Sequence, residues 1–269
     1  MEEKPSIMKT VQVLPAEVDT AALELKVKKM YRDVALNPDG EFHFEMGRAL
    51  AERLGYPSRT LDRIPEPAIS SFAGVGYYFH LADIAPGEFV VDLGSGAGMD
   101  AFYAALATGT YGKVLGVDMT EEQLEKSILL ALQNGFHQVN FTRGYIEELP
   151  IKDGVVDVVI SNGVVNLSAN KEQVFKEVAR VLKSGGRMAF SDIVSGEDLP
   201  ANITCNATLW AACIGGAVTG ATYLQMIEEA GLRVIQMEDN PAYQFLSNSA
   251  QGATSKYGIK SVSILAVKP

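Results

Sequence analysis

The sequence predicts an α/β fold, in which a mainly parallel β-sheet carries helices on both faces and a helical cap precedes it. Two observations carry this prediction. Short apolar runs alternate with helical patterns from about residue 89 onward, and the segment before them contains helical patterns but no strand. Strands that alternate with helices indicate βαβ units, which build parallel sheets. The 269 residues are 47% hydrophobic and 21% charged, as in ordinary globular proteins.

Apolar runs mark the candidate strands of this sheet. They are residues 89–93, 113–118, 139–143, 155–162, 187–193, 232–238 and 262–267. Helix candidates lie between them at 120–134, 171–182 and 222–230. The first opens with Thr120-Glu121-Glu122-Gln123, a capping-box pattern, and Gly135 can end it. The second places its apolar side chains on one face, as a helix packed on a sheet requires.

The N-terminal part of the chain follows a different pattern. Residues 21–34 and 44–54 have helical periodicity, and Pro65 and Pro67 interrupt the segment that follows. No strand pattern alternates with these helices. We therefore expect residues 1–78 to form a helical cap that packs on a core formed by residues 79–269.

Charge and composition exclude several classes of protein. The formal net charge is −10, which disfavours sequence-independent binding to nucleic acid. The start of the chain is polar and acidic, and no apolar run approaches the roughly 18 residues that span a bilayer. The chain has 2 cysteines, too few for a disulfide framework. We expect a cytoplasmic protein, monomeric or homodimeric, with no nucleic-acid or membrane partner.

A glycine-rich loop follows the first candidate strand, in the segment from Val90 to Asp100. It lacks the Gly-Lys-Ser/Thr of a phosphate-binding P-loop. A dinucleotide fingerprint needs a third glycine where this chain has Met99. An NAD-dependent oxidoreductase is the alternative interpretation, and it requires that Met99 be tolerated there. The pattern that fits is acid-x-Gly-x-Gly-x-Gly, which is typical of sites for S-adenosylmethionine (SAM). An incidental glycine-rich turn is the remaining alternative.

Two further segments support a nucleoside site. Asp118 ends the second candidate strand, where an acid can accept both ribose hydroxyls. Residues 144–150 follow the third strand and lie at the carboxyl edge of the sheet, a position that suits adenine. Ile146 is the candidate for contact with the adenine ring. Glu147 is either an adenine contact or a surface acid.

These segments, together with Ser161–Leu167 and Val181–Arg187, resemble the class I SAM-dependent methyltransferases. The resemblance covers roughly residues 70–269. Within that class, Glu41–Phe44, Ser71–Gly76 and Leu209–Ala217 look most like the arsenite methyltransferases. The resemblance implies a Rossmann-like, seven-stranded sheet with an antiparallel last strand.

The resemblance also implies roles for individual residues. Asp92, Gly94, Ser95, Gly96 and Gly98 would surround the methionyl part of SAM. Asp118 would bind the ribose, Met119 would flank the adenine, and Ile146 with Glu147 would lie at its far side. Ser161 and Asn162 would face the reacting methyl group. The product of the cofactor would be S-adenosylhomocysteine (SAH).

The chain departs from the arsenite methyltransferases at their cysteines. Those enzymes bind trivalent arsenic through thiolates, and soft ions prefer sulfur ligands. Gly163 replaces one family cysteine, Cys213 matches another, and no cysteine precedes Cys205. On one continuous helix, Cys205 and Cys213 would be about 12 Å apart and could not share an ion; a bend between them could bring them together. Cys213 is either a ligand in the site or a small buried apolar residue.

We therefore expect methyl transfer to a small-molecule acceptor, with Gly163 providing room for it. An arsenite or thiol S-methyltransferase that uses Cys213 is one alternative, and a non-catalytic SAM-binding protein is another. Asn162, Cys213 and Tyr31 are the candidate catalytic residues, and Trp210 is either a pocket wall or core packing. We expect no metal site, although Glu41, His43 and Glu45 alternate.

Overall fold

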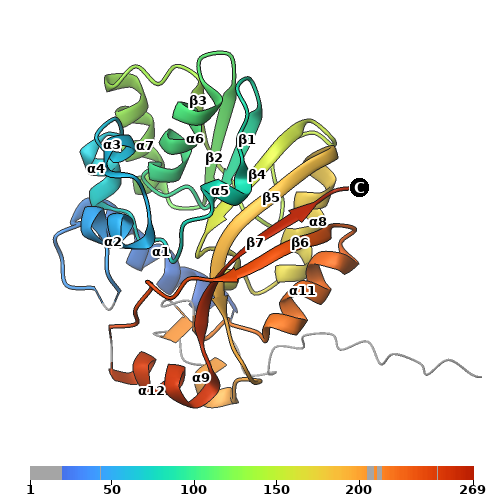
Figure 1. Ribbon diagram of the computed structural model, residues 1–269. Coiled ribbons are helices and arrows are strands. Elements are labelled where there is room, and N and C mark those ends of the chain that lie inside the picture. The colour runs from blue at the N-terminus through green and yellow to red at the C-terminus, as the bar shows by residue number, and fades with distance from the viewer. Residues whose placement is uncertain (1–19, 43, 205–208, 211–213, 247) are drawn as a thin grey trace, which may run out of the picture.

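The computed structural model describes residues 20–42, 44–204, 209–210, 214–246 and 248–269. Its centre is a 7-stranded sheet with the strand order β3-β2-β1-β4-β5-β7-β6, which the ribbon view shows flanked by helices (Figure 1). The strands are β1 (Phe89–Leu93), β2 (Lys113–Asp118), β3 (Val139–Arg143), β4 (Val156–Asn162), β5 (Leu182–Val194), β6 (Arg233–Asp239) and β7 (Lys260–Val267). Each candidate strand of the sequence analysis is thus present, with ends shifted by a few residues.

The pairing of the strands confirms the expected sheet. Strand β1 lies parallel to both β2 and β4, and the parallel pairing continues to β3 on one side and β5 on the other. Strand β7 is antiparallel to β5 and β6. Because Leu93 pairs with Ser161 and with Val117, the carboxyl ends of β1, β2 and β4 meet at one edge.

Helices fill the connections and the N-terminal region. Those before the sheet are α1 (Thr20–Leu36), α2 (Gly47–Leu54), α3 (Ser58–Leu61), α4 (Glu66–Ser70) and α5 (Phe79–Ala82). Those within it are α6 (Met99–Thr108), α7 (Glu121–Gln133), the 3-10 turn η1 (Val165–Leu167), α8 (Lys171–Val181), α9 (Ala201–Thr204), α11 (Gly220–Glu229) and α12 (Asn248–Tyr257). The expected capping box is wrong, because Thr120 precedes α7 but its side chain caps no helix amide.

Alternate residues of the strands pack into two apolar cores. Val90 and Ile160 lie in a core with α6 and cap residues such as Leu50 and Ile69. Val91 and Val159 face the other side, where α8 and α11 cover them. Helices thus cover both faces, as alternating strands and helices predict. The first core is continuous from the cap into the sheet, and the boundary at residue 78 stays a prediction.

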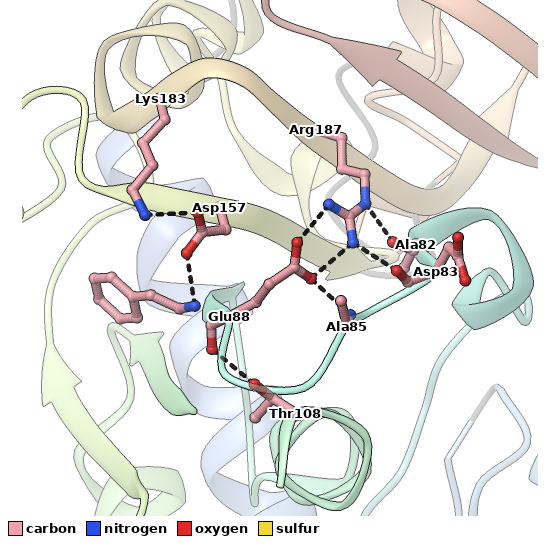
Figure 2. A network of polar contacts seen from close by, with 9 residues as sticks. Ala82, Asp83, Ala85, Glu88, Thr108, Asp157, Lys183 and Arg187 are labelled. Carbon is pink, nitrogen blue, oxygen red and sulfur yellow. Dashed lines mark hydrogen bonds and ion pairs between the residues drawn. The ribbon is translucent and has the colours of Figure 1, made fainter. Parts of the chain in front are cut away.

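A polar network lies at the amino edge of the sheet, as Figure 2 shows. Arg187 in β5 binds both carboxylate oxygens of Glu88, the residue before β1, at 2.9 and 2.8 Å. The same guanidinium donates to the carbonyls of Ala82 and Asp83 at the end of α5. This network joins the cap side of the molecule to the middle of the sheet.

In the part of the chain that the structure describes, none of the helices combines the length and apolar character needed to cross a bilayer.

Candidate active site

A cavity of about 340 Å³ lies at the carboxyl edge of the sheet. The core contributes the glycine loop after β1, the end of β2 and the segment after β3, while α1, α4 and residues 71–74 contribute the cap side. The cavity is lined by most of the site residues expected from sequence: Tyr31, Asp92, Gly94, Ser95, Gly96, Asp118, Met119, Ile146, Glu147 and Asn162. Parallel α/β sheets bind ligands at this edge.

The three glycines of the loop have different reasons to be glycine. All have left-handed backbones, with φ of +66° at Gly94, +52° at Gly96 and +93° at Gly98. A Cβ atom at Gly94 would lie 2.4 Å from Val164, and one at Gly98 would lie 2.7 Å from Phe141. At Gly96 the nearest atom would be 3.8 Å away, so Gly96 alone leaves room toward the cavity. Gly98 itself does not line the cavity and begins helix α6.

Several buried polar atoms around the cavity have no hydrogen-bond partner among the described residues. They are Oδ2 of Asp92, Oγ of Ser95 and Oε1 of Gln123, and all three residues line the cavity. Buried polar atoms in folded proteins are almost always paired. These atoms therefore fit a polar ligand that supplies the missing donors, as the ammonium and hydroxyl groups of SAM would.

The charge of the cavity wall favours a cationic ligand. Five acidic residues line the cavity, and its described lining contains no lysine, arginine or histidine. The acids are Glu24, Asp92, Asp100, Asp118 and Glu147. Burial is the main cause that raises the pKa of the Asp92, Asp100 and Asp118 carboxyls. A bound cation would offset the cost of keeping several carboxylates out of water.

Asp118 lies at the end of β2, as expected. Its two oxygens accept hydrogen bonds from the amides of Gly96, at 2.9 Å, and Thr120, at 2.8 Å. These bonds fix the carboxylate between the glycine loop and the start of α7. A carboxylate held in this way can accept the ribose hydroxyls of a nucleoside.

Asn162 lies at the end of β4 and its amide is fully engaged within the protein. Its Oδ1 accepts from the amides of Val75, at 2.7 Å, and Gly76, at 3.3 Å. Its Nδ2 donates to Tyr56, Gly76 and Asp100 at 3.0 to 3.1 Å. Asn162 therefore fixes the cap turn at residues 74–76, a role that the sequence did not indicate.

Ser161 does not meet the expectation that it faces the reacting group. Its side chain is fully buried, and its hydroxyl donates to the carbonyl of Leu93 at 3.1 Å. Asn162 lines the cavity, whereas Ser161 is not part of its described lining.

Two polar contacts connect the segment after β3 with its neighbours. Glu147 accepts a short hydrogen bond from Ser168 in the loop after η1. The hydroxyl of Tyr145 donates to Glu24 of α1 at 2.8 Å and accepts from Lys28 at 2.8 Å. Glu147 is thus held by protein, while Ile146 beside it lines the cavity.

The sequence also contains candidate residues for binding an acceptor or a metal ion. Cys205, Cys213 and His43 lie outside the described residues. Gly163 is buried but does not line the cavity, and its φ of +71° is a left-handed conformation that favours glycine. The left-handed backbone gives one reason for a glycine here, and room for an acceptor at Gly163 stays a prediction.

Tyr31 lines the cavity from α1. Trp210 is almost fully buried, packs with Leu23 and Val27 of α1, and donates to the carbonyl of Leu167 at 3.3 Å. Trp210 is therefore the packing residue that supports this wall of the cavity, and it is not itself part of the lining.

Sequence reasoning missed Asp100, Gln123 and Tyr56. Asp100 follows the glycine loop in α6 and accepts hydrogen bonds from Tyr56 and Tyr78. Gln123 lies in the first turn of α7, and its Nε2 donates to the carbonyl of Tyr31. An acid directly after a glycine loop is a signal that could have identified Asp100. No local pattern identifies the other two, because their partners are distant in sequence.

This α/β fold contains a nucleotide-type site, which is formed by the glycine loop, the acid at the end of β2 and the capped cavity. Comparison with known proteins identifies the class of protein. Residues 84–231 match the family model described as a methyltransferase domain. The chain belongs to this family and is a SAM-dependent methyltransferase domain.

The chain is also similar in sequence to proteins of known name. An arsenite methyltransferase of Halobacterium salinarum is 40% identical over 187 residues, which are 70% of this chain and 48% of that protein. The human arsenite methyltransferase is 41% identical over 139 residues, 48% of this chain and 37% of that protein. The chain thus spans about half the length, or less, of these curated relatives.

Solved structures support the same assignment. An arsenic(III) SAM methyltransferase from Chlamydomonas reinhardtii superposes with a TM-score of 0.63 at 27% identity, covering 84% of this chain and 75% of that one. A geranyl diphosphate methyltransferase has a TM-score of 0.65 at 18% identity and covers 92% of this chain and 100% of that one, which shows the fold alone.

Proposed function

We propose that this domain transfers the methyl group of SAM to a small-molecule acceptor that is neutral or cationic. The observation that carries the proposal is the acid-lined cavity, in which Asp92, Ser95 and Gln123 each present an unpartnered polar atom. The charged residues of the described lining are all acidic, so an anionic acceptor would meet no cationic side chain there. The chain's 2 cysteines and the glycine at position 163 argue against an acceptor held by a set of thiolates.

The proposed roles of the residues combine the resemblance to class I methyltransferases with the places of these residues in the cavity. Bound SAM supplies an electrophilic methyl group on a sulfonium. Asp92 and Gly96 would hold its methionyl end, Asp118 its ribose, and Met119 with Ile146 its adenine. Backbone hydrogen bonds fix the acceptor oxygens of Asp118 before the ligand arrives. Such positioning accelerates a bimolecular reaction.

The cap would provide the acceptor side. Leu23, Val27 and Tyr31 of α1 and Phe72 line the cavity opposite the glycine loop. Apolar side chains there exclude water from the transfer step. The described lining offers no histidine or lysine as a general base, so the acceptor atom would be one that is nucleophilic without strong base assistance, or one that Tyr31 assists.

The proposal is tested by measuring SAH formation with matched acceptors. Thiols and amines would be paired with analogues that carry an added carboxylate, and arsenite with glutathione would form a separate arm. We expect SAH and methylated product from neutral or cationic members, and at least tenfold less from their anionic partners. Asp118→Ala is the inactive control. Rapid formation of methylarsenicals, or equal turnover of the anionic partners, would overturn the proposal.

A second candidate is S-methylation of arsenite or another soft element with Cys213 as a ligand. It is favoured by the 40% identity to the arsenite methyltransferase of Halobacterium salinarum. In the arsenite arm, activity that Cys213→Ser abolishes while SAM affinity is unchanged would support this candidate over the first.

A further inference from the structure

Two buried carboxylates, Asp92 of β1 and Asp100 of α6, line the same cavity with no cation beside them in its described lining. Asp92 is 2% exposed and Asp100 is 5% exposed. Two neighbouring buried carboxyls cannot both ionise at low cost, so one of them tends to keep a proton. The hydrogen bonds of Asp92 and Asp100 indicate which of the two carboxyls keeps the proton.

Asp100 has three hydrogen-bond donors that favour its ionised form and oppose the rise in its pKa that burial causes. Its Oδ1 accepts from the hydroxyl of Tyr56 at 2.7 Å, and its Oδ2 accepts from the hydroxyl of Tyr78 at 2.7 Å and from Nδ2 of Asn162 at 3.1 Å. Three donors aimed at one carboxylate stabilise its charge, and a proton on it would displace one of them.

Asp92 has the opposite surroundings. Its Oδ2 is buried and has no partner among the described residues. The charged groups that act on it are Asp100 from α6 and Asp118 from β2, both acidic, and a hydrogen bond from the backbone of Ala101 opposes their effect. Tyr56 and Tyr78 donate to Asp100. Burial, with these two acids, raises the pKa of Asp92 well above its ordinary value.

We propose that the free protein carries a proton on Asp92 Oδ2 and that the ammonium group of the cofactor displaces this proton to solvent on binding. The inference rests on the SAM site of the proposed function and adds a step to it. The O–H bond of Asp92 breaks, the proton leaves to water, and the carboxylate pairs with the ammonium, while no bond of the cofactor changes. Asp100 is the positioning residue, because its charge keeps the proton on Asp92.

Proton release is measured by calorimetric titration of the full chain with SAH near pH 7 in buffers of different ionisation enthalpy. SAH carries the same ammonium group and undergoes no turnover. We expect the wild type to release more protons per SAH bound than Asp100→Asn, by a sizeable fraction of one proton. The amino group of SAH contributes equally in both titrations and cancels in the difference. Asp239→Asn, which changes an exposed acid outside the cavity lining that pairs with Lys260 at 2.7 Å, should match the wild type.

A second measurement needs no variant. The infrared difference spectrum between SAH-bound and free wild type should show loss of the carbonyl band of a protonated carboxylic acid. Equal proton release in the wild type and a folded Asp100→Asn, or no such band in the free protein, would overturn the inference while leaving the cofactor site intact. If SAH does not bind at all, the cofactor site and this inference fail together.

Discussion

Asn162 shows how a single amide can join three parts of this molecule. Its side chain contacts the cap turn through Val75 and Gly76, helix α6 through Asp100, and the cap through Tyr56. A Cβ atom at Gly74 would lie 2.6 Å from the Asn162 amide, so the turn approaches the amide more closely than a side chain would permit. The order of the cap wall therefore depends on this one residue at the end of β4.

Asp192 of β5 should govern part of the pH dependence of stability. It is fully buried, and burial raises its pKa from 3.8 to about 6, despite hydrogen bonds from Ile193, Tyr223 and Asn166 that oppose the shift. Between these values the folded state keeps a proton that the unfolded state has lost. The stabilisation is therefore complete below about pH 4 and is lost as the pH rises through about 6.

The substitution Asp192→Asn should remove this loss of stability with rising pH. A pKa difference of about 2 between the folded and unfolded states corresponds to about 3 kcal/mol in the free energy of unfolding. The wild type should lose this amount relative to the variant between about pH 4 and pH 7. Urea unfolding of both proteins across that range measures it. Two stability curves that run parallel over the whole range would contradict the prediction, whatever their vertical offset.

The residues of the site were predictable where the motif is local. The glycine loop and Asp118 carry their signal within a strand and its following turn, and the structure places them around one cavity. Gln123 and Tyr56 act on partners far away in sequence, Tyr31 and Asp100. No short pattern records such a contact. Ser161 is not part of the described lining, and its hydroxyl donates to the carbonyl of Leu93, a contact that no sequence pattern records.

Helix α1 is the element that closes the cavity, and the core holds it by side chains that reach its backbone. Gln123 donates to the carbonyl of Tyr31 at 2.9 Å, and Lys126 donates to that of Ala35 at 3.2 Å. Arg32 and Glu122 add an ion pair at 3.0 Å. Four apolar residues of α1 are buried, Leu23, Val27, Val34 and Ala35, so its attachment depends on their packing, in part against Trp210, as well as on these polar contacts.

Val27→Asn should loosen α1 and weaken SAM binding, while Leu25→Asn should do neither. Val27 is 1% exposed and packs with Trp210, whereas Leu25 on the same helix is 69% exposed. An amide at position 27 would be buried without a partner, at a cost of about 1–3 kcal/mol. We expect an increase of about tenfold in the Kd for SAM and faster amide exchange in α1.

By helix propensity Leu25→Asn costs slightly more than Val27→Asn, so a larger effect of Val27→Asn reports burial. Calorimetric titration with SAM and hydrogen exchange measure the two effects. Equal SAM affinity of both variants would show that α1 does not close the site.

At the scale of secondary-structure elements, the sequence predicted the strands of the sheet well but did not predict the short helices. Strands β1 and β2 have the predicted bounds, because an apolar run between turns defines a buried strand. Strand β5 begins at Leu182 instead of 187, since its first residues are polar and glycine-rich, without an apolar pattern. The helices α3, α4 and α5 have 4 or 5 residues, too few to show a helical period.

Ligand binding and a large part of the stability of the molecule depend on opposite edges of the sheet. The cavity lies at the carboxyl ends of β1, β2 and β4. The network of Arg187 lies at the amino ends, where Glu88 precedes β1 (Figure 2). The left-handed backbone of Asp83, with φ of 41°, ends α5 in this network, and its carbonyl accepts from Arg187.

Arg187→Met should therefore lower stability without changing SAM affinity. The substitution leaves the carbonyls of Ala82 and Asp83 without their donor and removes both ion-pair contacts of Glu88, whose side chain is 20% exposed. Loss of such a partly buried group costs about 2–4 kcal/mol. Lys260→Met makes the same change of charge in a pair whose side chains are 50% and 60% exposed, and should cost less than about 1 kcal/mol. Urea unfolding and calorimetric titration with SAM measure both quantities. A Kd for SAM that rises in Arg187→Met under conditions where the protein is fully folded would show that the two edges are coupled through the sheet.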